Sequence, residues 1–118
     1  MEIGGKGLAE VNLTIPQATS LTFDVVHKDD QGNVVDHSDS ALYMAIQSKD
    51  GRETYHMDAC ASATAQRIRI SIPATITDEL PLGKLVWDLI ATTDEGETLR
   101  LCYGGVSVVD TYALDESE

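Results

Sequence analysis

One short stretch of the chain contains all three residue types of a serine-hydrolase triad, Asp36-His37-Ser38-Asp39-Ser40. In such enzymes an aspartate orients a histidine, and the histidine takes the proton of the attacking serine. The three side chains come from separate segments, which lets each one point at the next. Neighbours in a single turn lack that freedom, so we expect a solvated turn here, no catalytic residues and no enzyme.

Acidic residues are dense in the same region and suggest calcium as a ligand. Calcium needs alternating oxygen ligands and a closing bidentate carboxylate, and the turn Asp29-Asp30-Gln31-Gly32-Asn33 has neither. The histidines are scattered and can meet only by accident of folding, and the sequence has no CxxC pair. We therefore expect no metal site and no cofactor. The residues weighed are Asp24, Asp29, Asp30, Asp36 and Asp39 for calcium, and His27, His37 and His56 for other metals.

Two cysteines, Cys60 and Cys102, permit one disulfide. The first ten residues, MEIGGKGLAE, contain no apolar run of signal-peptide length, and no later stretch approaches the length of a spanning helix. We therefore expect a chain that folds in a reducing cytoplasm with two buried or half-buried thiols. A disulfide between them is the alternative.

The composition excludes two classes of partner. The 118 residues include 20 acidic and 8 basic side chains, which gives a formal charge of −12, and the isoelectric point is near 4.4. Phosphate backbones are bound by a stripe of Lys and Arg that this chain cannot assemble, so we expect neither nucleic-acid nor membrane binding. The length fits a single domain.

Apolar and polar residues alternate with a period of two along most of the chain, which predicts strands with one buried face. The runs are Val11–Ile15, Ser20–His27, Leu42–Gln47, Gln66–Ile72, Lys84–Thr92 and Thr98–Val109. The side chains expected in the interior are Leu21, Phe23, Val25, Leu42, Met44, Ile46, Ile68, Ile70, Ile72, Leu85, Trp87 and Leu89. In the last run, Gly104-Gly105 shifts the apolar register and predicts a β-bulge.

Turn residues separate these runs. Lys49-Asp50-Gly51 and Thr93–Glu97 each place a glycine after acidic residues, as hairpins require. The only helix-like stretch, Thr75–Leu80, predicts a single turn crossing between sheets. Short strands with almost no helix indicate an all-β fold: an antiparallel β-sandwich of immunoglobulin-like architecture with about seven to eight strands. We expect a flexible segment over 1–10, one domain over 11–112 and an acidic tail over 113–118.

The order of the motifs resembles small β-sandwich proteins encoded near the tail and baseplate genes of tailed bacteriophages and prophages, such as the N-terminal domain of baseplate upper proteins. The resemblance covers most of the chain. It implies a non-enzymatic structural protein, assembled in the host cytoplasm and then part of the virion tail, whose partners are other tail or baseplate proteins. The matching motifs are Leu13-Thr14-Ile15-Pro16-Gln17, Asp29–Asp36, Lys49-Asp50-Gly51, Ile68–Thr77, Gly83–Leu89 and Gly96–Val108.

A different function on the same fold is a module that binds carbohydrate or a host surface. Such modules display aromatic side chains to solvent, and the candidates are Tyr43, Tyr55 and Tyr103. Aromatic residues make up only 5% of the chain, which favours the structural protein. A small enzyme is the least favoured hypothesis.

Assembly is expected to depend on open sheet edges. The segments Val11–Ile15 and Val106–Val109 are apolar and carry no Lys or Arg, so they are poor at blocking edge pairing. We expect each to offer an edge to a partner's strand. The charge of −12 opposes self-association, which predicts a monomer or weak dimer for the isolated protein.

Overall fold

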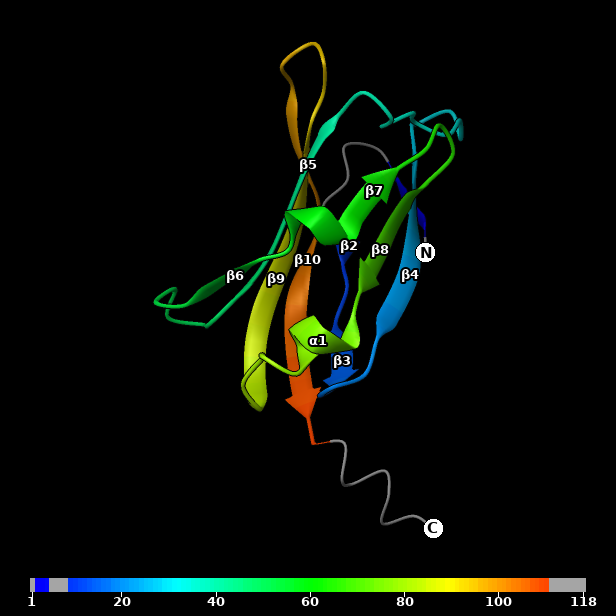
Figure 1. Ribbon diagram of the computed structural model, residues 1–118. Coiled ribbons are helices and arrows are strands. Elements are labelled where there is room, and N and C mark those ends of the chain that lie inside the picture. The colour runs from blue at the N-terminus through cyan, green and yellow to red at the C-terminus, as the bar shows by residue number, and fades with distance from the viewer. Residues whose placement is uncertain (1, 5–8, 111–118) are drawn as a thin grey trace.

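A computed structural model describes residues 2–4 and 9–110 of the chain. These residues form an all-β sandwich of two sheets with one short helix near one end (Figure 1). The elements are β1 (Glu2–Gly4), β2 (Ala9–Glu10), β3 (Leu13–Pro16), β4 (Leu21–Lys28), β5 (Ala41–Gln47), β6 (Thr54–His56), the 3-10 turn η1 (Asp58–Cys60), β7 (Ala61–Ala63), β8 (Ile68–Ile72), α1 (Ala74–Thr77), β9 (Gly83–Thr92) and β10 (Thr98–Val109).

The two sheets differ in size. The small sheet has the order β1-β4-β8-β7, and the large sheet has the order β2-β10-β9-β5-β6, with β3 also paired to β10. Neighbours are antiparallel except for three parallel pairs, β1 with β4 and both β2 and β3 with β10. The sandwich prediction is confirmed, and its immunoglobulin-like arrangement stays a prediction.

The five long strands β4, β5, β8, β9 and β10 lie where the alternation predicts them. The described residues hold ten strands rather than seven to eight, because β1, β2, β6 and β7 are too short to show a period. Two of these short strands, β1 and β2, lie inside the segment 1–10 that we expected to be flexible. The expected acidic tail, 113–118, lies outside the described residues. None of the described helices has the length and apolar character to span a membrane.

The core lies between the sheets and contains the predicted side chains. Nine of the twelve are buried, and Leu21, Phe23 and Leu42 are half-buried and pack against the others. Trp87 of β9 joins the layers, because its ring meets that of Phe23 of β4 edge-on at 6.1 Å between centroids. A T-shaped pair of this kind adds stability beyond the area it buries.

The prediction of an open apolar edge is wrong for Val106–Val109, because this segment of β10 lies inside the large sheet between β9 and β3. Residues Leu13–Pro16 of β3 lie parallel to Val106–Val109 of β10. Among the described residues β3 pairs with β10 alone, so the predicted edge in Val11–Ile15 remains at the outer side of the large sheet. The outer strands of the two sheets, β1, β2, β3, β6 and β7, have two to four residues each, and short edge strands are a common protection against strand addition.

The bulge lies elsewhere than predicted. The register of β10 against β9 shifts between Arg100 and Cys102, so Leu101 is the extra residue. Leu101 and Cys102 are consequently both fully buried. Gly104 and Gly105 continue the ladder without interruption, and their small size has another cause.

Gly104 and Gly105 lack side chains because the junction between β2 and β3 packs closely against them. The Val11 carbonyl oxygen accepts a 2.7 Å hydrogen bond from Trp87 Nε1, and a methyl group on Gly104 would collide with this oxygen. The Gly105 N–H donates to Asn12 Oδ1 at 2.9 Å. Gly104 therefore has to lack a side chain, so that the backbone between β2 and β3 can approach β10 closely enough for Val11 to bind the Trp87 indole.

The turns follow the sequence signals. Gly51 and Gly96 have φ values of 76° and 89° in the hairpins β5–β6 and β9–β10, as the left-handed position in such turns requires. The single helical turn α1 connects β8 of the small sheet to β9 of the large sheet. Both predictions are confirmed.

Candidate functional site

Two of the three scattered histidines meet inside the protein. His27 of β4 and His37 of the following loop are 4% and 2% exposed. Their rings stack at 5.2 Å between centroids, and His27 Nδ1 lies 2.9 Å from His37 Nε2. His37 Nδ1 in turn lies 3.0 Å from Ser40 Oγ. The third histidine, His56, is exposed on β6.

The hydrogen bond between the imidazoles requires one nitrogen with a proton and one without. A second proton on the pair would place two N–H groups against each other, so the contact holds at most one imidazolium. Burial lowers the pKa of His37, and the proximity of His27 lowers it further, while the Asp36 carboxylate opposes the shift. His37 is therefore harder to protonate than a solvated imidazole.

The expectation that turn neighbours cannot point at one another fails for His37 and Ser40, which are hydrogen-bonded. Serine, histidine and a second histidine form a connected series, as a nucleophile and its base do. The hollow beside Ser40, however, is bordered by carboxylates, which would repel the oxyanion that forms in acyl transfer. That the chain is no enzyme stays a prediction. The carboxylates belong to Asp36, Asp39, Asp94, Glu95 and Glu97.

The five aspartates weighed for calcium do not converge. Asp29 Oδ1 accepts from the N–H groups of Gln31 and Asn33 in its own turn, and Asp36 Oδ1 accepts from the Ser38 N–H. Asp24 lies on β4 and binds arginines instead. Within residues 2–4 and 9–110, no group of three or more His, Cys, Asp or Glu side chains is arranged to hold a metal ion.

Asp24 joins two arginines on the outer face of the small sheet. Arg69 Nε lies 2.9 Å from Asp24 Oδ1, and Arg67 Nη1 lies 3.1 Å from Asp24 Oδ2. The hydrogen bond from Arg69, supported by that from Arg67, lowers the pKa of Asp24 to about 2. A hollow beside the arginines is lined by Ser62, Thr64, Ala65 and Gln66.

Both cysteines are buried free thiols, as expected without a disulfide. Burial raises the pKa of Cys60 and raises that of Cys102 to about 11. A thiol that stays protonated is a poor nucleophile and a poor metal ligand. The cysteines are therefore core residues.

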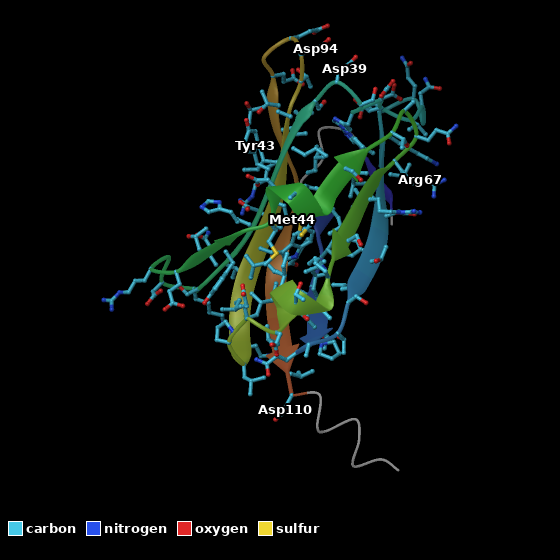
Figure 2. The ribbon with its side chains drawn as sticks, in the orientation of Figure 1. Asp39, Tyr43, Met44, Arg67, Asp94 and Asp110 are labelled. Carbon is cyan, nitrogen blue, oxygen red and sulfur yellow. The ribbon has the colours of Figure 1, made fainter. Side chains whose placement is uncertain are left out.

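The outer face of the large sheet carries two of the three candidate tyrosines. Tyr43 on β5 is 51% exposed, and Figure 2 shows it outside the sandwich while its neighbour Met44 points inward. Tyr103 on β10 lies on the same face, because Leu101 and Cys102 both turn inward and reset the alternation. Tyr55 packs against the core from β6 instead.

A groove of about 360 Å³ runs along this face beside Tyr103. Neighbouring strands place Ala45, Asp88 and Tyr103 in one row across the sheet. The next row holds Gln47, Val86 and Gly105. We call the groove, with its lining residues Glu10, Gln47, Val86, Trp87, Asp88, Arg100, Tyr103, Gly104 and Gly105, the β10 groove.

Sequence reasoning named the tyrosines and the histidines but not their partners. The β10 groove depends on the register of three strands, and the His27–His37 contact depends on the path of the loop between them. Neither a protein-family model nor a curated protein sequence matches the chain. The interpretation of both sites therefore rests on their geometry and chemistry.

Proposed function

We propose that the chain is a non-enzymatic structural protein of a bacteriophage or prophage tail or baseplate, which acts through contacts with other tail proteins. The observation that supports this best is an apolar end of the sandwich, formed by Pro16, Leu82 and Val109. Leu82 is 54% exposed and Val109 is 37% exposed. Apolar side chains gathered at one end of a small domain are typical of a protein-contact surface.

Strand pairing brings these three residues together. Pro16 at the end of β3 lies opposite Val109, and Gly83 lies opposite Val108, which places Leu82 beside the same end of β10. Two of the surrounding loops are tied together, because the Gln17 side chain donates to the Leu80 carbonyl at 2.8 Å. A surface held this firmly loses little conformational entropy when a partner binds.

The opposite end of the sandwich is acidic. Figure 2 shows Asp39 and Asp94 at the upper end, where they border a hollow together with Asp36, Glu95 and Glu97. Like charges at the upper end, with the net charge of −12, repel a second copy of the chain. This favours contact with a different protein over self-assembly, with assembly in the host cytoplasm before the chain joins the virion tail.

The test is incorporation into particles. In a host that carries the encoding phage with this gene deleted, the wild-type chain and a Leu82→Asp/Val109→Asp variant would be supplied from a plasmid. Immunoblots of purified particles should show the wild type and lack the variant. Val34→Asp is the matched control, since Val34 is also exposed, at 42%, but lies in a loop away from the apolar end.

Val34→Asp should be incorporated like the wild type. Absence of the wild-type chain from purified particles would refute a role in the tail. Incorporation of the double variant at the wild-type level would refute the apolar end as the contact.

A further inference from the structure

The β10 groove has a floor of bare backbone and a wall of polar side chains. Gly105 contributes no side chain, and its row neighbours across the sheet are Val86 and Gln47. The strand between the tyrosines carries Asp88, opposite Tyr103 on one side and the small Ala45 on the other. The result is a trough in the outer face of the large sheet.

The Tyr103 ring forms one side of this trough and is held in place. The Arg100 guanidinium lies 5.0 Å from the ring centroid, and Arg100 Nε lies 3.8 Å from Asp88 Oδ2. These contacts restrict the motion of the ring before any ligand binds, which reduces the entropy lost on binding.

Tyr43 continues the aromatic surface beyond the groove. Tyr43 pairs with Ile90, and Ile90 pairs with Arg100, so Tyr43 lies two strands and one row away from Tyr103. Strand spacing and rise put their Cα atoms about 12 Å apart. Two aromatic rings at this separation on one face suit an extended ligand with several ring-sized apolar patches.

The polar groups of the groove select the chemistry of that ligand. Glu10 and Asp88 supply carboxylate acceptors, and Gln47 supplies both an acceptor and donors. Two carboxylates against the single guanidinium of Arg100 disfavour anions such as phosphates or uronic acids. Hydroxyl groups donate well to carboxylates, and the C–H faces of pyranose rings stack on tyrosine.

We propose that the β10 groove binds a neutral glycan chain, with one pyranose on Tyr103, its hydroxyls on Asp88, Gln47 and Glu10, and the chain continuing toward Tyr43. This binding is independent of the contact through Pro16, Leu82 and Val109, since it uses the face of the large sheet rather than its end. A tail protein with both surfaces would hold its assembly with one and a host saccharide with the other.

The test is an NMR titration of the ¹⁵N-labelled protein with cellohexaose, maltohexaose and chitohexaose in separate arms. At least one should shift amide signals of residues 43–47, 86–90 and 100–105 and leave those of the small sheet in place. No shift with any of the three sugars, or shifts centred on Arg67 and Arg69, would overturn the proposal. A lysine hexapeptide as a fourth arm should not compete with the sugar, and displacement of the sugar by that peptide would assign the groove to a cationic segment.

Two variants locate the ligand. Tyr103→Ala removes the stacking surface and should weaken binding roughly ten-fold. Gly105→Val fills the floor of the groove, where an added Cβ would meet only Asn12 Oδ1 at 3.4 Å, and should abolish binding while the protein stays folded. Tyr55→Phe alters a tyrosine outside the groove and should bind like the wild type. Wild-type affinity in the Tyr103→Ala and Gly105→Val proteins would refute the site, and neither result bears on incorporation into particles.

Discussion

A single methyl group at Gly104 should destabilise the protein strongly, because it would force apart the first strands and β10. In the Gly104→Ala variant the added Cβ would overlap the Val11 carbonyl oxygen, and it would lie 2.7 Å from the carbonyl carbon and 3.2 Å from Asn12 Oδ1. The Val11 peptide is anchored on both sides, since its N–H donates to the Tyr103 carbonyl at 2.8 Å and its oxygen accepts from Trp87.

The loss in the free energy of unfolding can be estimated from the contacts that the added methyl group would displace. Overpacking that displaces backbone costs about 1–3 kcal/mol. If the Val11 carbonyl moves away, the Trp87 indole N–H loses its partner in a residue that is only 2% exposed, and an unsatisfied buried donor costs about 1–3 kcal/mol. Together these give a loss of roughly 2–6 kcal/mol, a large part of the stability of a domain this size.

Urea unfolding followed by fluorescence measures this loss directly, because Trp87 is the only tryptophan of the chain. Gly105→Ala is the matched control. Its Cβ would meet Asn12 Oδ1 at 3.4 Å, an ordinary contact, so its stability should change by less than about 1 kcal/mol. Equal losses in the two variants, or a greater loss in Gly105→Ala, would show that Val11 does not constrain β10 in this way.

Four further predictions concern other parts of the molecule. Ile70 is fully buried, so Ile70→Ala should cost about 2–5 kcal/mol in urea unfolding, and a loss well under 1 kcal/mol would contradict its place in the core. Burial lowers the pKa of His37 from its usual 6.5, so the unfolded chain takes up a proton that the folded chain resists. The contribution of His37 to the free energy of unfolding should therefore be constant above about pH 7.5 and should fall as the pH drops through 6.5 toward the lower pKa of the folded state. The His37→Gln variant should flatten this part of the stability profile. An unchanged profile would contradict the role of His37. Millimolar calcium should leave the melting temperature unchanged, and a rise of several degrees would indicate a metal site among the loop aspartates. Light scattering at low and physiological salt should give a monomer or weak dimer, and a stable trimer or hexamer would count against the repulsion expected from the net charge.

The long strands could be predicted because each has enough residues to show its period. Ile68, Ile70 and Ile72 of β8 alternate with polar side chains, and all three are buried. The three-residue strands β6 and β7 have no such signal. Their pairing is decided by the chain on either side, which turns through η1 from the large sheet to the small one.

The candidate sites were only partly predictable. Tyr43, Tyr55 and Tyr103 could be named as candidate surface aromatics, but the bulge at Leu101 decides that Tyr103 shares a face with Arg100, three positions earlier. The contact between His27 and His37 closes a loop of ten positions whose path no local pattern specifies. In both cases the deciding information is a long-range register or loop path rather than a residue type.

The pairing of β3 with β10 also constrains the order of folding. Asn12 and Gly105, which are hydrogen-bonded at this junction, are 93 positions apart in the chain. During synthesis the segment that becomes β3 leaves the ribosome long before its partner exists, and contacts of such long sequence separation form slowly. Until β10 emerges, β3 and the adjacent edge of β9 are both unpaired, which is the state in which a nascent chain is most exposed to strand exchange with another copy. The short outer strands protect the finished sandwich, and the slow pairing of β3 with β10 is the step of folding at which strand exchange between copies is most favoured.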